Sequence, residues 1–156
     1  MKLLITSDSH GRVSHMQRAV EREQPDRLYH LGDVMRDLER LSLACPHVPM
    51  DGISGNCDGI GAFSSCMEVE VEGVRLMLTH GHLYQVKRGL TDLAAQGERL
   101  GVDGVLFGHT HQATAYQRPG GLWLINPGSV GGVRAAATYA VVMVNRGELR
   151  VELKAL

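Results

Sequence analysis

The chain is poor in several features that would place it in a specialised class of protein. Its 156 residues include only three cysteines and 4% aromatic residues, and the formal net charge is −1 with histidine neutral. Cys45, Cys57 and Cys66 cannot all pair and do not have zinc-finger spacing, so we expect reduced thiols in a cytoplasmic protein. The near-neutral charge gives no support for broad binding to nucleic acid or to a membrane surface, although it leaves room for a local basic patch.

Long apolar runs are also missing. No apolar segment approaches the length that a membrane-spanning helix needs, so we expect no association with a membrane. The apolar run at residues 1–5 is followed by Asp8 too soon to form the hydrophobic part of a secretion signal. Because internal repeats, low-complexity tracts and clear linkers are absent as well, we expect one domain that covers residues 1–156.

Strand and helix patterns alternate in the first half of the chain. Short apolar runs predict strands, and apolar residues at helical spacing predict helices between them. The third strand is the weakest of these predictions, since Pro49 and Gly52 both count against regular pairing. The predicted elements are strands at residues 2–7, 27–31 and 47–54 and helices at 13–23 and 34–44.

The second half is rich in hairpins. Three pairs of alternating segments flank turn sequences, namely Glu72-Gly73, Pro119-Gly120-Gly121 and Asn145-Arg146-Gly147. Together with the first half, they indicate an α/β protein whose sheets mix parallel and antiparallel strands, with two packed sheets as one arrangement. The predicted hairpins are 67–71 with 74–78, 113–117 with 122–126 and 139–144 with 149–153, besides a helix at 90–100 and a strand at 104–107.

Side chains that can bind metal follow five of the predicted strands. Imidazole is the commonest metal-binding side chain at neutral pH, and in α/β sheets functional sites form outside the carboxyl ends of the strands. We therefore expect these side chains to converge on one site. They are Asp8 and His10, Asp33, Asn56, His80 and His82, and finally His109 and His111 in the segment Gly108-His109-Thr110-His111.

Each of these residues also has an ordinary structural explanation. An Asp or Asn at a strand end is usually a turn former or a helix N-cap, and Asp33 could be only that. His80 or His82, taken alone, would more often be a loop histidine than a ligand. However, five of the eight histidines lie at strand ends beside glycines, together with two carboxylates and one amide. This convergence favours a metal site, with His15, His30 and His47 outside it.

The ligand types limit the metal. Imidazole and carboxylate without a positioned thiolate suit manganese, iron, zinc, cobalt or nickel better than calcium or an iron–sulfur cluster, and we expect manganese first. Seven candidate ligands are too many for one tetrahedral ion, but they suit two ions about 3.5–4 Å apart that share a carboxylate. The positive charge that remains would attract a phosphate group. The seven are Asp8, His10, Asp33, Asn56, His80, His109 and His111.

The order of these motifs resembles the calcineurin-like metallophosphoesterase superfamily. The resemblance is closer to its small bacterial and archaeal phosphodiesterase branch, which is related to the retromer phosphoesterase-like subunit. It covers residues 1 to about 145. The resemblance implies a four-layered α-β-β-α sandwich of mixed sheets. It rests on Asp8-Ser9-His10-Gly11, Gly32-Asp33, Gly55-Asn56-Cys57-Asp58, Thr79-His80-Gly81-His82, Gly108-His109-Thr110-His111 and Asn126-Pro127-Gly128-Ser129.

The resemblance also implies a role for each ligand. It assigns one ion to Asp8, His10 and His111, a bridging position to Asp33, and the second ion to a group made up of Asn56, His80 and His109. Asn56 would in addition reach an oxygen of the substrate phosphate, so Asn56 and Asp33 are the catalytic candidates. The implied activity is hydrolysis of a P–O bond in a small phosphoester, most readily a diester, by a hydroxide that bridges the two ions.

Two positions depart from the wider family pattern. Cys57 stands where many members have a histidine that is thought to assist the leaving group, so protonation of the leaving group stays unassigned. A cysteine nucleophile at this position is disfavoured, because the nearby histidines are committed to metal. The segment 131–134 lacks a proline that often precedes the arginine there. Arg134 could contact a phosphate or be an ordinary surface arginine, and His82 could orient His80, approach the substrate or cap its turn.

Two other functions compete with hydrolysis. The chain could be a catalytically weak or inactive protein that keeps the fold and binds partners through its surface, as the related retromer subunit does; such a protein is expected to lose ligand residues, and none is lost here. The chain could instead process nucleic acid, but its near-neutral charge and few aromatic residues make this weaker. Homo-oligomerisation through an exposed hairpin edge stays open.

Overall fold

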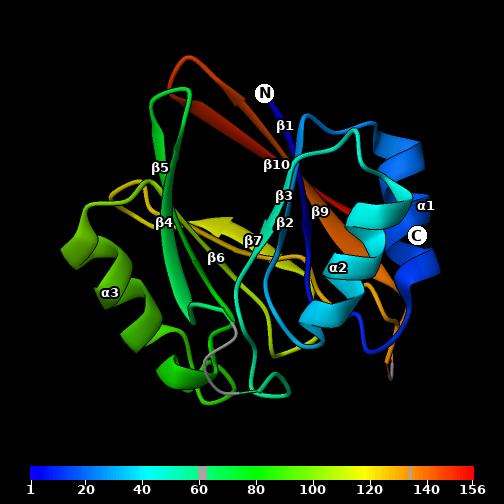
Figure 1. The fold of residues 1–156 in the computed structure, drawn as a ribbon. Coiled ribbons are helices and arrows are strands. Elements are labelled where there is room, and N and C mark those ends of the chain that lie inside the picture. Colours follow the sequence, from blue (N-terminus) through cyan, green and yellow to red (C-terminus); the bar gives the residue numbers. More distant parts are fainter. Residues whose placement is uncertain (60–62, 134) are drawn as a thin grey trace.

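The computed structural model describes residues 1–59, 63–133 and 135–156. Within them, two five-stranded mixed sheets lie face to face with helices on their outer sides (Figure 1). Sheet A has the strand order β10-β9-β1-β2-β3, and sheet B has the order β4-β5-β6-β8-β7. The elements are β1 (Lys2–Thr6), α1 (Val13–Glu23), β2 (Arg27–His30), α2 (Met35–Ala44), β3 (Met50–Gly52), β4 (Cys66–Val71), β5 (Val74–Thr79), the 3₁₀ turn η1 (His82–Tyr84), α3 (Thr91–Leu100), β6 (Gly104–Phe107), β7 (Thr114–Gln117), β8 (Trp123–Asn126), β9 (Thr138–Asn145) and β10 (Glu148–Ala155).

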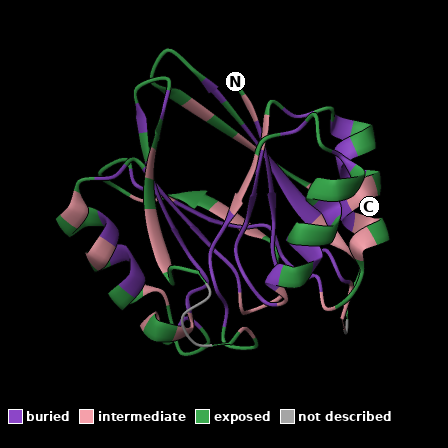
Figure 2. Cartoon of the chain, viewed as in Figure 1, coloured by how far each residue is buried: buried purple, intermediate pink, exposed green. Residues whose placement is uncertain are grey.

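The alternation of side chains along each buried strand builds three apolar layers. On β1, Leu3 and Ile5 face the space between the sheets, whereas Leu4 packs beneath α1 and α2. On β6, Leu106 faces the same central space and Phe107 packs beneath α3. Successive residues of a strand point to opposite faces, so each central strand contributes to two layers of the core. The layers are visible as buried strands between half-exposed helices in Figure 2, and the predicted four-layered sandwich is confirmed.

The largest differences in length between predicted and observed strands concern β3 and β10. The strand expected at residues 47–54 shrinks to β3, which pairs with β2 through Leu28 and Met50. Pro49 precedes that pairing, and it has no N–H to contribute to a ladder. The strand expected at 149–153 extends to Glu148–Ala155, because β10 pairs with β9 along its whole length although its exposed side chains blur the apolar pattern.

Parallel pairing directs several strand ends to one edge of the sandwich. In sheet A, β1, β2 and β3 run parallel, and in sheet B, β5, β6 and β8 do so. The segments that follow β1, β2, β3, β5 and β6 carry the predicted ligands, so the pairing within each sheet brings that sheet's ligands to one edge. None of the helices in the three described segments is long and apolar enough to cross a membrane.

Candidate metal centre

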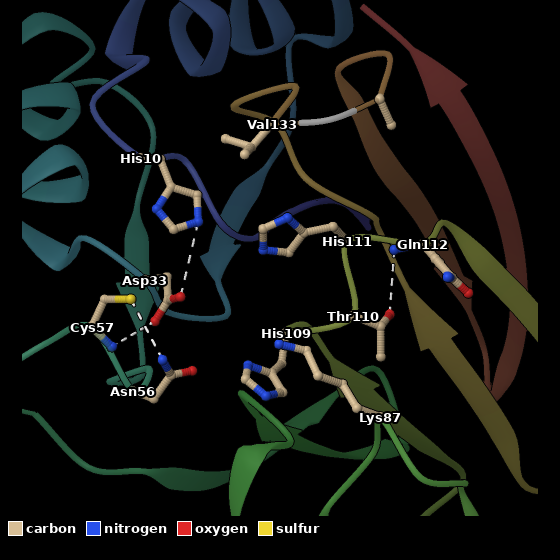
Figure 3. Close-up of a pocket in the computed structure, with 11 residues that line it drawn as sticks. His10, Asp33, Asn56, Cys57, Lys87, His109, Thr110, His111, Gln112 and Val133 are labelled. Carbon is tan, nitrogen blue, oxygen red and sulfur yellow. Dashed lines mark hydrogen bonds and ion pairs between the residues drawn. The ribbon is translucent and has the colours of Figure 1, made fainter.

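The structure brings all seven predicted ligands together at this edge. A cavity of about 540 Å³ opens there, and Figure 3 shows how the side chains on its wall converge. Asp8 and His80 lie beneath that wall and are fully buried. The predicted ligands that line the cavity itself are His10, Asp33, Asn56, His109 and His111.

One group of side chains gathers around Asp8. The Nε2 atom of His111 lies 3.0 Å from Oδ1 of Asp8, and the Nε2 atom of His10 lies 4.0 Å from the same oxygen. The two imidazole rings are 5.4 Å apart, centre to centre. These three residues come from the loops after β1 and β6, and their donor atoms are close enough to hold one ion.

A second group gathers around His80. Its Nε2 atom lies 3.1 Å from Oδ1 of Asn56 and 3.5 Å from Oδ1 of Asp33. The ring of His109 is 5.0 Å from the ring of His80. This group combines the loops after β2, β3, β5 and β6, so both sheets contribute to it.

The two carboxylates lie between the groups. The Asp33 Oδ2 atom is 3.9 Å from Nε2 of His10, while its Oδ1 atom faces His80. Oδ1 of Asp8 is likewise 4.0 Å from Nε2 of His80. Each carboxylate therefore faces a histidine of both groups, which is the arrangement that a shared ligand requires.

The hydrogen bond of His80 to the backbone directs its other ring nitrogen to the centre. Its Nδ1 atom is 2.7 Å from the carbonyl oxygen of Leu31, which can only accept a proton. Its Nε2 atom faces the side-chain oxygens of Asn56 and Asp33. These three atoms form a donor set that a divalent cation would fit.

Two orphaned polar atoms point to a metal. Oδ1 of Asp8 and Nε2 of His10 are buried and have no hydrogen-bond partner among the residues that the structure describes. Leaving buried polar atoms unpaired costs free energy, and proteins rarely do so without a function. Both atoms are of the kind that divalent transition metals bind, so the residues present fit such an ion.

The backbone at the ligands is strained. Left-handed φ angles are rare outside glycine, and such strain collects at functional sites. Half of the ten described non-glycine residues with positive φ are predicted ligands. They are Asp8 (53°), His10 (44°), Asp33 (59°), His109 (68°) and His111 (59°).

The motif Asn126-Pro127-Gly128-Ser129, to which the sequence assigned no role, is hydrogen-bonded to the loops after β1 and β6. The Asn126 side chain donates to the carbonyl of Gly108 at 2.9 Å and to Oγ1 of Thr110 at 3.0 Å, and so fixes the segment that carries both histidines. The Ser129 hydroxyl donates to the carbonyl of Asp8 at 2.8 Å. Gly108 is needed at this contact, because a Cβ atom there would collide with Ser7 and approach Oδ2 of Asp8 to 2.9 Å.

Asp58 joins the two loops of sheet A that carry Asp33 and Asn56. Its carboxylate accepts four backbone N–H groups, from Asp33 at 3.1 Å, Val34 at 3.1 Å, Met35 at 2.7 Å and Gly55 at 2.8 Å. Two of these donors belong to the start of α2, where a carboxylate is favoured by the helix dipole. Sequence reasoning missed this role, although Asp58 is the last residue of the quoted Gly-Asn-Cys-Asp motif.

Replacing Asp58 by asparagine should loosen both loops. An amide cannot accept all four bonds with the strength of a charged carboxylate, so we expect a loss of about 2–3 kcal/mol in the free energy of unfolding. Metal affinity should fall by roughly 10- to 100-fold, as for other residues that orient metal ligands. Chemical denaturation and metal titration measure the two effects. Asp92→Asn, on α3, is the control; equal behaviour of the two variants would contradict the role.

Burial and hydrogen bonds set the protonation states around the cavity. Burial, and then the neighbouring His80 and Lys87, lower the pKa of His109 to about 4, so its ring is neutral at physiological pH, as a metal ligand must be. Burial raises the pKa of Asp33, but the N–H of Cys57 and the nearby His80 outweigh it and leave the pKa below its usual value. Burial, followed by Asp33, raises the pKa of the Cys57 thiol to about 11. This makes Cys57 a poor nucleophile, in agreement with the sequence argument.

Three further side chains are relevant to substrate binding at the cavity. Lys87 lines the cavity beside His109 and supplies a positive charge, which periodicity and motifs did not indicate. His82 is not among the described residues that line this cavity; its ring is 5.4 Å from that of His80, and its buried Nδ1 atom has no hydrogen-bond partner within the described segments. The predicted substrate contact Arg134 lies outside the described residues.

Comparison with known proteins gives this geometry a family. A family model, the calcineurin-like phosphoesterase superfamily domain, matches residues 1–147. The chain is 34% identical over 146 residues to the probable metallophosphoesterase YsnB of Bacillus subtilis, covering 91% of this chain and 83% of that protein. It is 31% identical over 154 residues to phosphodiesterase YfcE of Escherichia coli, covering 83% and 79%.

A solved structure agrees at the level of the fold. Vacuolar Protein Sorting 29 from Cryptosporidium parvum superposes with a TM-score of 0.77 at 16% identity, covering 99% of this chain and 97% of the other. At that identity the likeness concerns the fold alone. The family match and the two bacterial relatives carry the assignment: this chain belongs to the calcineurin-like phosphoesterase superfamily.

Proposed function

We propose that the protein is a cytoplasmic phosphodiesterase that hydrolyses a P–O bond of a small phosphoester with the help of two divalent metal ions. The observation that carries the proposal is the convergence of seven donor residues from five strand ends on one cavity, where Oδ1 of Asp8 and Nε2 of His10 are buried and have no hydrogen-bond partner in the described part of the chain. The name of the relative YfcE supports the choice of a diester.

The donor groups suggest how the ions would be held. Asp8, His10 and His111 would hold one ion, and Asn56, His80 and His109 would hold the other. Asp33 would be shared, because its two oxygens face a histidine of each group. Two such ions supply positive charge for the phosphate and a hydroxide nucleophile at neutral pH. The mixed nitrogen and oxygen donors favour manganese, with iron, zinc, nickel or cobalt as alternatives.

The other side chains of the cavity would bind and orient the ester. The Oδ1 atom of Asn56 faces His80. The Nδ2 atom of Asn56 is 3.5 Å from the sulfur of Cys57 and would donate to a phosphate oxygen when the ester is bound. Lys87 would add a charged donor at the rim. Such fixed donors lower the barrier when they face the charge that develops on the phosphate.

Cys57 predicts a preference among leaving groups. With a pKa of about 11, its thiol is a weak proton donor at neutral pH, so poor leaving groups receive little help. We expect aryl phosphate esters to turn over roughly 100-fold faster than alkyl esters of the same charge. Steady-state rates on matched diesters measure the ratio, and equal rates would contradict it.

The proposed function is tested by a hydrolysis screen. The protein is stripped of metal, reconstituted with each of the five metals, and assayed on phosphomonoesters, phosphodiesters and cyclic nucleotides. Turnover of diesters that depends on added metal supports the proposal, with manganese expected to give the highest rate. Absence of turnover with every metal would overturn it.

The alternative is a binding or scaffold protein of the same fold. The likeness to Vacuolar Protein Sorting 29 is the observation in its favour. Against it, the chain retains the complete donor set, and the strained backbone at five of those residues would have no purpose in a protein that only binds partners. A protein that binds metal but turns over no ester in the screen would favour this alternative.

A further inference from the structure

A second cavity adjoins the candidate metal centre. It measures about 440 Å³ and is lined by Ser54, Asn56, Phe63, Ser65, His82 and Leu83, among others. Asn56 lines both cavities, so it stands at the boundary between them. His82 lines the second cavity and also lies beside the candidate metal centre, because its ring is 5.4 Å from the ring of His80.

Two large apolar side chains on this wall are exposed. Phe63 is 40% exposed and Leu83 is 62% exposed, although most apolar side chains of this size in the chain are buried. Leu83 belongs to the 3₁₀ turn η1 directly after the loop of His80. Exposed apolar surface beside polar groups is typical of a ligand pocket, where it contacts an apolar part of the ligand.

The wall is anchored to the strands that carry the ligands. The Ser54 N–H donates to the carbonyl of Ser64 at 2.9 Å, and its hydroxyl donates to the carbonyl of Phe63 at 3.2 Å. The Thr79 hydroxyl, at the end of β5, donates to the carbonyl of Ser65 at 3.3 Å. Phe63 is thus held in place by the ends of both sheets.

The wall has one carboxylate among its described residues, that of Asp58. Its oxygens already accept four backbone N–H groups and are not available to bind a cation, while its negative charge disfavours an anionic occupant. Hydroxyl and imidazole groups remain, from residues such as Ser65 and His82. An occupant that suits this wall is therefore uncharged and mostly apolar, and its flat face can pack against Phe63.

We propose that the second cavity is the subsite for a planar, uncharged substituent of the phosphoester, such as an aryl ring or a nucleobase. This inference rests on the proposed function, since a phosphate at Asn56 would direct one substituent into each cavity. The substrate class is then a diester with at least one aromatic substituent. A monoester would leave the second cavity empty and forgo its contacts.

Binding of phosphinates tests the subsite without requiring turnover, because they resemble a diester and have no P–O ester bond to hydrolyse. Metal-loaded protein is titrated calorimetrically with diphenylphosphinate and with dimethylphosphinate, which differ only in their two substituents. We expect diphenylphosphinate to bind roughly tenfold more tightly. Phe63→Ala and Leu83→Ala should each remove most of that preference, while Leu43→Ala, an 83% exposed leucine on α2, should keep it. Metal content is measured for every variant, so that a damaged centre is recognised.

The outcomes separate the two proposals. If neither variant changes the preference, or if the wild-type protein shows none, the subsite is wrong even when the screen finds a phosphodiesterase. If the preference depends on Phe63 and Leu83 but no ester is hydrolysed, the subsite stands as a binding site and the proposed hydrolysis fails. In an active protein, the same variants should lower kcat/KM for bis-aryl diesters roughly tenfold more than for the aryl monoester.

Discussion

Replacing Asp33 by asparagine should abolish metal-dependent hydrolysis while leaving the fold intact. The amide has nearly the shape of the carboxylate, and Asp58 still holds the backbone of this loop. What the variant loses is the negative charge that faces both His10 and His80. We expect kcat/KM for an aryl diester to fall by roughly 1000-fold or more, since a charged group at the reacting centre is removed.

The control for this variant is Asp51→Asn. Asp51 lies on β3 of the same sheet, is half exposed and pairs with Arg27 instead of facing the cavity. Circular dichroism and thermal unfolding check that both variants fold, and metal analysis shows whether Asp33→Asn still binds ions. Unchanged turnover by a metal-loaded Asp33→Asn protein would exclude a shared role for this carboxylate.

His109→Ala and His111→Ala should empty different metal positions. The His111 ring contacts Asp8 and lies near His10, whereas the His109 ring packs against His80. Because the two histidines are only two residues apart on one loop, a general disturbance of that loop would affect both ions alike. We expect each variant to retain about one ion per chain instead of two, and not the same one.

Metal analysis gives the number of ions, and anomalous scattering from crystals of each variant shows which position is filled. His47→Ala, an exposed histidine remote from the cavity, should keep both ions. Loss of both ions from both variants would mean that the loop holds one cooperative site, and the division between the two histidines would have to be abandoned.

The positions of the predicted ligands could be inferred from the sequence because their cause is local. Each follows a short apolar run, and the rule that parallel strands end at one edge brings such residues together. His80 illustrates this, since the parallel pairing of β5 with β6 puts it near His109 at the same edge of sheet B. The structure confirms the sandwich and the convergence, while metal binding by these seven residues stays a prediction.

Other parts of the site depend on contacts between distant segments and could not be predicted. Asn126 and Asp58 belong to motifs that can be recognised in the sequence. Their hydrogen bonds, however, join loops that only the folded chain brings together. Lys87 lies in a region of turns with no periodic pattern, so nothing in the sequence directed it to the cavity. The left-handed backbone conformation of His109 and His111 could not be predicted either, because a histidine in the sequence does not indicate a positive φ angle.

Because the candidate donors come from both sheets, metal binding at this centre would tie the stability of the protein to its metal supply. The apolar layer between the sheets joins them by packing, whereas a cation held by both sets of donors would act as a cross-link at the open edge. Ions that bind only the folded chain raise its unfolding free energy, by about 2.7 kcal/mol at a hundredfold excess over Kd. A cell starved of metal would therefore hold fewer folded molecules as well as fewer active ones. The donors are Asp8, His10, Asp33 and Asn56 after strands of sheet A, and His80, His109 and His111 after strands of sheet B.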